Sequence, residues 1–212
     1  KPSEYAPQTG LNMSQAWFDA GLPQEYFNPI LGDGFIGSEL VKQPIDGLFF
    51  TGSYATGMKI SQALAGRFTR LQLELGGKDP AYVRSDVDVK NAAGSLAEGS
   101  FYNTGQSCCA VERIYVHASI YDEFVDAFAE AVSGFKMGDP FEPDVFLGPL
   151  TREEQLPVLQ AQVDDAVAKG ANLVMGGKRR EGKGYFYLPT VLSQVNHSME
   201  VMREETFGPV IG

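Results

Sequence analysis

Apolar side chains recur along the chain at two spacings, one typical of amphipathic helices and one typical of strands. The helical spacing predicts helices over residues 8–20, 35–42, 54–64, 88–103, 121–135 and 153–169. Apolar or alternating runs predict strands over residues 26–31, 47–51, 71–75, 113–117, 173–175 and 185–191. Residues 32–34 are predicted to form a turn, 137–150 a loop, and 199–205 a short element of undetermined type.

This alternation of helix and strand predicts an α/β fold. Successive strands joined by helices form parallel sheets through right-handed crossovers, with helices on both faces, which gives three layers. We expect residues 47–51 to be a buried strand, because Gly47 to Thr51 is the most apolar strand-like run. The glycine pair at 76–77 is the best candidate for a domain boundary, dividing the chain into residues 1–75 and 76–212.

Composition and charge exclude several classes of protein. A chain of 212 residues and 23.0 kDa, with 43% hydrophobic side chains, can bury a core and is not wholly disordered. The net charge of −10 argues against a nucleic-acid partner, and the one basic cluster, residues 178–180, is interpreted as a solvated loop. No apolar run is long enough for a membrane span.

The cysteines and histidines narrow the candidate chemistry further. Cys108 and Cys109 are adjacent, too close along the chain for a favourable disulfide, so a reducing compartment is expected. His117 and His197 are the only histidines, and neither is placed against a thiol or beside other metal ligands by its spacing. We therefore expect no metal site and disfavour a cysteine hydrolase that works without a cofactor.

Two glycine-containing turns are candidate phosphate sites. The run from Gly32 to Gly37 matches G-x-G-x-x-G, but no acidic residue follows about 20 positions later to hold a ribose, so a tight turn is favoured over a dinucleotide fingerprint. Gly52 and Ser53 come directly after a strand and before a helix. They could bind phosphate at the helix N-terminus, or Ser53 could simply cap that helix.

Two side chains are candidates for catalysis. Cys108 follows a glycine-containing turn, where a nucleophile can be exposed, although free cysteines are often buried. Glu74 alternates with Leu73 and Leu75, so it faces away from them and could act as a base or simply face solvent.

Taken together, five segments resemble the NAD(P)-dependent aldehyde dehydrogenase superfamily. They occur in the family's order, and the resemblance runs from the first residue to the last. The segments are residues 1–4 (KPSE), 50–53 (FTGS), 73–78 (LELGGK), 101–109 (FYNTGQSCC) and 204–209 (EETFGP).

The resemblance implies a role for each matching residue. Cys108 would be the nucleophile and Glu74 the general base. The cofactor would be held by Lys1, Glu4, Gly52, Ser53, Glu205 and Phe207. The aldehyde pocket would be bordered by Phe101, Tyr102, Ser107 and Cys109. Residues 1–75 would then be part of an NAD(P)-binding Rossmann-like domain, and 76–212 most of a catalytic domain.

The implied reaction oxidises an aldehyde to a carboxylic acid through a cysteine thiohemiacetal and a thioester. A glutamate base favours hydrolysis of that thioester over transfer to coenzyme A. NAD is preferred over NADP, because the Glu4 carboxylate would repel a 2′-phosphate. The family also implies a homodimer or homotetramer, and the expected location is the cytoplasm.

The chain lacks an initiator Met, and the family's upstream asparagine and its C-terminal oligomerisation strand have no counterpart within it. We therefore expect an internal fragment with little or no dehydrogenase activity of its own. The alternative function is a catalytically inactive chain with a structural or binding role on the same fold.

Overall fold

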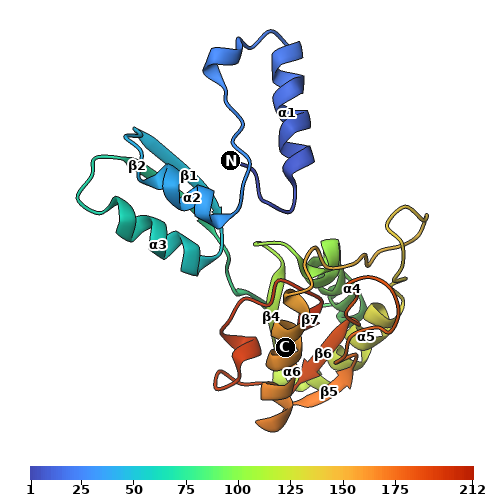
Figure 1. The fold of residues 1–212 in the computed structure, drawn as a ribbon. Helices are drawn as coiled ribbons and strands as arrows, with labels where there is room; N and C mark the ends of the chain where they lie inside the picture. Colours follow the sequence, from blue (N-terminus) through green and yellow to red (C-terminus); the bar gives the residue numbers. More distant parts are fainter. The chain divides into compact units, whose positions relative to one another are not determined.

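The computed structural model describes all residues, 1–212, and divides them into two compact units, Lys1–Leu75 and Gly76–Gly212 (Figure 1). Both units combine helices with short sheets, as an α/β fold requires. Their assignment as cofactor-binding and catalytic domains remains a prediction.

The first unit contains one parallel β–α–β crossover. Its elements are α1 (Pro7–Asp19), the 3-10 helix η1 (Gln24–Tyr26), α2 (Gly34–Val41), β1 (Gly47–Gly52), α3 (Tyr54–Leu64) and β2 (Arg70–Leu75). Strands β1 and β2 pair in parallel, from Gly47 opposite Arg70 to Gly52 opposite Leu75. Helix α3 connects them, and the Leu75 side chain lies against Gly57 of that helix.

Two predictions for the first unit are wrong. No strand forms over residues 26–31, where η1 ends and irregular chain follows; Pro29 has no backbone N–H to contribute to a ladder. Residues 47–51 form a strand, but it is not buried. Only alternate side chains of β1 are partly covered, and Phe49 is 85% exposed, because a two-stranded sheet with helices on one side leaves its other face open.

The second unit builds a larger sheet between helices. Its helices are α4 (Val89–Phe101), α5 (Tyr121–Ser133) and α6 (Gln155–Ala168), with 3-10 helices η2 (Tyr102–Gly105), η3 (Ala118–Ile120) and η4 (Glu200–Met202). Its strands are β3 (Asp79–Val83), β4 (Val111–Val116), β5 (Asn172–Met175), β6 (Thr190–Ser193) and β7 (Val210–Ile211).

Three pairings order these strands. β3 and β4 are parallel, as are β6 and β7, whereas β5 runs antiparallel to β6. The Ile114 N–H donates at 2.9 Å to the carbonyl of Gly212, the residue after β7, which brings β4 beside β7. The two-stranded sheet β3-β4 and the three-stranded sheet β7-β6-β5 therefore lie side by side in this order, with the antiparallel β5 at one edge.

Hydrophobic cores lie on both faces here, so the predicted three layers are confirmed for this unit, although β5 departs from the predicted parallel direction. Neighbouring residues of one strand face opposite sides. Val191 of β6 joins the core formed with α4 and α5, whereas Leu192 joins the core formed with α6. In β7, likewise, Ile211 joins the core formed with α4 and α5, and Val210 joins the core formed with α6.

Two details of the second unit differ from the expectation. The strand predicted over 185–191 begins only at Thr190, since Tyr187 forms an isolated bridge with Arg179 and Pro189 precedes the ladder. Strand β3 was not predicted, because its Asp79-Pro80 start does not have a strand-like composition.

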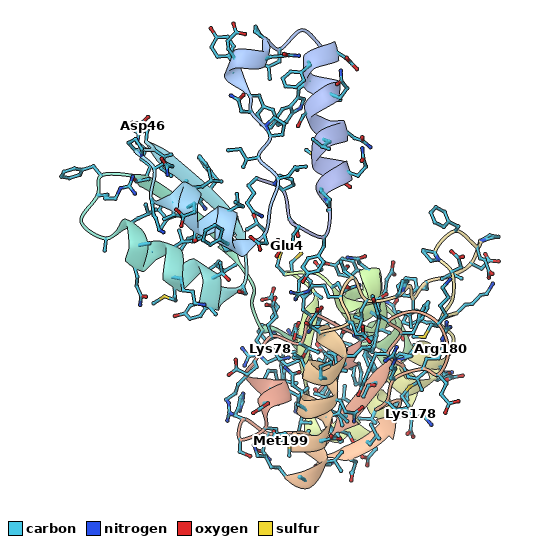
Figure 2. All side chains as sticks on the ribbon, in the orientation of Figure 1. Glu4, Asp46, Lys78, Lys178, Arg180 and Met199 are labelled. Carbon is cyan, nitrogen blue, oxygen red and sulfur yellow. The ribbon has the colours of Figure 1, made fainter.

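The basic cluster at 178–180 belongs to the second unit, where Figure 2 labels Lys178 and Arg180. Lys178 and Arg179 are exposed, as a solvated loop requires, but Arg180 is half-buried, with its guanidinium 3.7 Å from the centre of the Phe186 ring. The helices of both units are too short or too polar to cross a bilayer.

Candidate active site and cofactor-binding residues

The cysteine-bearing loop follows α4 through a turn of unusual backbone. Asn103, Thr104 and Gly105 have successive φ values of 50°, 59° and 71°, all in the left-handed region. Such conformations cost about 1–3 kcal/mol per non-glycine residue and persist only where the surroundings enforce them. A strained turn directly before Cys108 is therefore a feature that the rest of the unit must hold in place.

Hydrogen bonds within the loop and to residues 148–151 hold this turn in place. The Asn103 side-chain amide donates to the Gln106 carbonyl at 2.8 Å, and Gln106 Oε1 accepts from the Thr151 N–H at 2.9 Å. The buried Thr104 hydroxyl donates to the Gly148 carbonyl at 3.2 Å. The loop is thus anchored to the segment between α5 and α6, so Cys108 extends from a fixed backbone.

Both thiols at the end of this loop are exposed and unpaired. This excludes the interpretation of Cys108 as a buried core cysteine. The Cys109 sulfur lies 3.4 Å from the Ser107 hydroxyl and 3.3 Å from the Tyr102 hydroxyl. Hydrogen bonds from Ser107, and then from Tyr102, favour the thiolate and lower the pKa of Cys109.

Phe101 was predicted to border the aldehyde pocket, but its side chain is buried in the hydrophobic core. Its ring is 1% exposed and lies in the core of the second unit, with ring centres 6.4 Å from Phe128 and 6.2 Å from Phe135. Tyr102 and Ser107, in contrast, are half-buried and joined by a 2.5 Å hydrogen bond beside the thiols. Of the four predicted pocket residues, the structure brings Tyr102, Ser107 and Cys109 together.

Glu74 lies in β2 of the first unit, close to the end of the strand. The alternation along the strand is confirmed, because Leu71, Leu73 and Leu75 are half-buried while Gln72 and Glu74 are exposed. The Gln72 side-chain amide donates to Glu74 Oε1 at 2.9 Å. The carboxylate is therefore accessible, and Cys108 belongs to the other unit.

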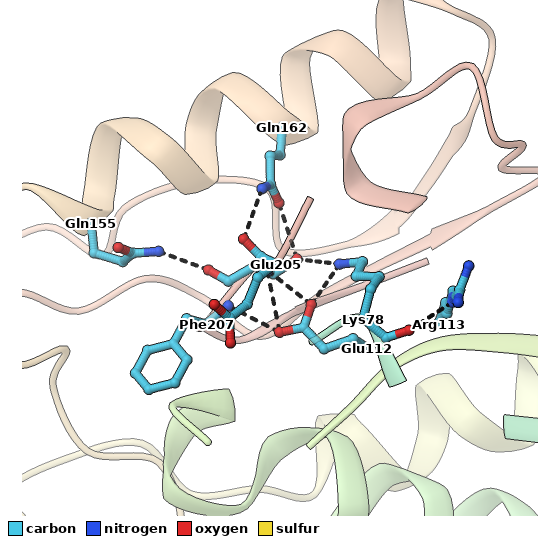
Figure 3. Close-up of polar contacts among 8 residues, drawn as sticks. Lys78, Glu112, Arg113, Gln155, Gln162, Glu205 and Phe207 are labelled. Carbon is cyan, nitrogen blue, oxygen red and sulfur yellow. Dashed lines mark hydrogen bonds and ion pairs between the residues drawn. The ribbon is translucent and has the colours of Figure 1, made fainter. Parts of the chain in front are cut away.

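A buried ionic network connects two of the motifs, residues 73–78 and 204–209, within the second unit (Figure 3). Lys78 Nζ lies 2.5 Å from Glu112 Oε2, with side-chain exposures of 7% and 6%, and donates to the Thr206 hydroxyl at 2.7 Å. Glu112 also accepts the backbone N–H groups of Thr206, at 2.9 Å, and Phe207, at 3.1 Å. Burial lowers the pKa of Lys78, and the Glu112 carboxylate opposes that shift.

Two glutamines complete this network from α6. Gln155 donates to the Thr206 carbonyl at 2.7 Å, and Gln162 accepts from the Thr206 hydroxyl at 3.0 Å and donates to the Glu205 carbonyl at 3.3 Å. The backbone of residues 205–207 is consequently fixed on both sides. Lys78 and Thr206 fall inside recognised motifs, but the roles of Glu112, Gln155 and Gln162 were not anticipated from the sequence.

Glu205 and Phe207 are the predicted nicotinamide-side residues, and this network holds them. Phe207 is 37% exposed with a φ of 46°, so its ring is available for contact. The Glu205 Oε1 atom is buried without a hydrogen-bond partner. Burial, together with the nearby Glu112 charge, raises the pKa of Glu205. A buried carboxylate oxygen without a donor fits a site that accepts hydrogen bonds from ribose hydroxyls.

The turn at residues 32–37 is a helix start, as favoured from the sequence. The Asp33 side chain accepts the N–H groups of Phe35, at 2.9 Å, and Ile36, at 3.4 Å, and so caps α2. Lys1 lies beside this helix, because a Cβ added at Gly37 would be 3.9 Å from its side chain. Lys1 Nζ is also 3.7 Å from the Glu4 carboxylate, so the two predicted ribose ligands are neighbours.

Gly52 and Ser53 lie at the N-terminus of α3, the other predicted cofactor contact in the first unit. The Ser53 hydroxyl accepts the Thr56 N–H at 3.3 Å, so it does cap the helix. Capping leaves other first-turn N–H groups without intrahelical partners, and these can still bind a phosphate. Both interpretations of this turn are therefore compatible with its geometry.

Comparison with known proteins identifies the class to which this fold and site belong. The model of the aldehyde dehydrogenase family matches residues 1–212. Lactaldehyde dehydrogenase of Escherichia coli is 41% identical over 214 residues, covering 100% of this chain and 45% of that protein. The NADP(+)-dependent succinate-semialdehyde dehydrogenase of Deinococcus radiodurans is 40% identical, covering 99% and 44%.

Solved structures agree with the sequence comparison. The crystal structure of the E. coli lactaldehyde dehydrogenase superimposes with a TM-score of 0.95 at 40% identity, covering 99% of this chain and 45% of that one. Betaine aldehyde dehydrogenase of Staphylococcus aureus, solved with NAD+, has a TM-score of 0.94 at 35% identity, covering 99% and 43%. The chain belongs to the aldehyde dehydrogenase family, and it spans less than half the length of the relatives it matches.

Proposed function

We propose that the protein carrying this chain oxidises an aldehyde to a carboxylic acid with NAD or NADP. The observation that carries the proposal is the exposed Cys108, which follows a left-handed turn anchored by Thr104 and Gln106. A nucleophile must be accessible and held in a fixed position, and strain concentrates at such sites. Family membership supports the reaction class.

In the proposed reaction the Cys108 thiolate attacks the carbonyl carbon of the aldehyde. A carbon–sulfur bond forms, and the carbonyl oxygen becomes an oxyanion, to which the Cys108 N–H can donate. The nicotinamide, when bound, would supply the hydride acceptor that this oxidation needs, and Cys108 would then carry the acyl group as a thioester. Glu74 then takes a proton from water, whose oxygen attacks the acyl carbon, and the thiolate leaves as the acid is released.

The residues proposed to hold the cofactor are compatible with its chemistry. Glu205 Oε1 has no hydrogen-bond partner within the chain and would accept from a ribose hydroxyl, and the N-terminus of α3 at Ser53 offers N–H groups to a phosphate. Lys1 and Glu4 together would bind the adenosine ribose. The partly exposed Glu4 carboxylate would repel a 2′-phosphate, so we propose NAD as the preferred cofactor.

The substrate is proposed to be a small aldehyde bound beside Tyr102, Ser107 and Cys109. Relatives are named for lactaldehyde, succinate semialdehyde and betaine aldehyde, which share the aldehyde group and differ in the attached chain. We also propose, from the family resemblance, a homodimer or homotetramer, and from the unpaired cysteines a cytoplasmic location.

Stopped-flow measurement of NADH formation tests the proposal through two variants. Cys108→Ser should abolish aldehyde-dependent NADH formation, because a serine hydroxyl is a far weaker nucleophile than a thiolate. Glu74→Gln should retain a burst of about one NADH per site while steady-state turnover falls about 100- to 10,000-fold, because only thioester hydrolysis needs the base.

The neighbouring Cys109→Ser variant controls for the loss of a thiol near the site and should keep the burst. Full activity in Cys108→Ser would overturn the proposed nucleophile. A Glu74→Gln variant that loses the burst would overturn the assignment of this carboxylate to hydrolysis. Absence of NADH or NADPH formation from the full-length wild-type protein with a panel of aldehydes would favour a structural or binding role.

A further inference from the structure

Gly76 lies directly against the carboxylate of Glu205. A Cβ built on Gly76 would overlap both oxygens of that carboxylate. The φ of Gly76 is outside the left-handed region, so any residue could adopt its backbone conformation. Space for the carboxylate is therefore the only observed reason for a glycine at this position.

The backbone of Glu205 cannot move to relieve such an overlap. Its carbonyl accepts from Gln162, and the next N–H group, that of Thr206, is held by the buried Glu112 carboxylate (Figure 3). The side chain can still shift, although its carboxylate accepts the Gly77 backbone N–H. A methyl group at Gly76 would thus displace the Glu205 carboxylate and leave the surrounding backbone in place.

We infer that Gly76 is a positioning residue for cofactor binding, which keeps open the place that the Glu205 carboxylate occupies. The inference rests on the proposed function, in which Glu205 accepts hydrogen bonds from the nicotinamide ribose. Glu205 Oε1, which is buried without a hydrogen-bond partner, supports the inference. A buried acceptor without a partner destabilises the fold, and a hydroxyl of a bound ribose would provide the missing donor. The glycine acts on the cofactor only through this carboxylate.

The expected effect of Gly76→Ala is weaker cofactor binding with little loss of stability. Hydrogen bonds to a charged group contribute enough affinity that losing their geometry should raise the Kd for NAD about 10- to 100-fold. The atom that must shift is the end of a flexible side chain, so the melting temperature should change by only a few degrees.

Calorimetric titration of the wild-type protein and four variants with NAD, and with NADP in parallel, tests this inference. The variants are Gly76→Ala, Glu205→Ala, the double variant, and Gly94→Ala as a control. Gly94 lies in α4 with no atom within 4 Å of an added Cβ. We expect the control to bind like the wild type, and the double variant to bind no more weakly than Glu205→Ala.

Wild-type affinity in Gly76→Ala would overturn the inference, as would a double variant in which the two losses add. Additive losses would mean that the alanine acts by a route other than the carboxylate. A wild-type protein that binds neither nucleotide would overturn the proposed function itself. A Gly76→Ala variant that melts far below the wild type would show a structural role and also contradict the inference.

Discussion

Replacing Lys78 with methionine should destabilise the second unit strongly. Methionine fills a similar volume but leaves the Glu112 carboxylate, 6% exposed, without its cationic partner. Removing one partner of a buried ion pair costs about 3–5 kcal/mol. The Thr206 and Phe207 N–H groups still bind the carboxylate, so the lower end of that range, about 3 kcal/mol, is expected.

Urea denaturation can separate this effect from changes elsewhere. Trp17 is the only tryptophan of these 212 residues and lies in the first unit, so its fluorescence should report a transition that Lys78→Met does not move. Far-ultraviolet circular dichroism measures the helices of both units, so it also reports the unfolding of the second unit. Lys136→Met, which breaks an exposed pair 3.5 Å from Glu142, is the matched control and should cost less than about 1 kcal/mol.

A double variant gives the sharpest test of the reasoning. Lys78→Met combined with Glu112→Gln removes both charges while the glutamine oxygen can still accept the two backbone N–H groups. It should be more stable than Lys78→Met alone, with a coupling of more than about 1 kcal/mol. A Lys78→Met variant within 1 kcal/mol of the wild type, or losses that simply add, would refute the electrostatic argument.

Substitutions in the cysteine loop and in the core should have separable effects. In a Cys108→Ser background, iodoacetamide should alkylate Cys109 with a midpoint below the usual thiol pKa of about 8.5, and Ser107→Ala should move that midpoint upward; an unmoved midpoint would contradict the role of the hydroxyl. Phe101→Ala should cost about 3–5 kcal/mol of stability because it empties a core position, whereas a pocket residue would change aldehyde KM with little effect on stability. Gly105→Ala should loosen the cysteine loop, because the φ of 71° at Gly105 is left-handed and an added Cβ would lie 2.7 Å from the carbonyl carbon of Gly208. Hydrogen exchange of the loop amides should therefore become faster. Unchanged exchange would show that the turn accommodates the alanine.

The local features of this fold could be predicted because they depend on neighbours along the chain. Asp33 and Ser53 cap helices through N–H groups two or three residues away, and the alternation of Glu74 with its leucines follows from the geometry of a strand. Phe101 shows how a motif can mislead. Phe101 lies four residues after the buried Ala97 and eight after the buried Ala93, so helical periodicity places it in the core. The family motif had instead suggested that it borders the aldehyde pocket.

The sequence by itself determined the family, the fold class, and the identity of Cys108 and Glu74 as candidates. These conclusions depend on short segments of the chain, whose residues can be compared directly with the motifs of a family. Only the tertiary structure decided that Glu112, 34 residues from Lys78 and 94 from Thr206, neutralises a buried lysine and fixes the backbone beside Glu205. It also decided that Gly76 leaves space for a carboxylate. Both depend on burial and on contacts between distant segments, and neither leaves a pattern in the order of residues.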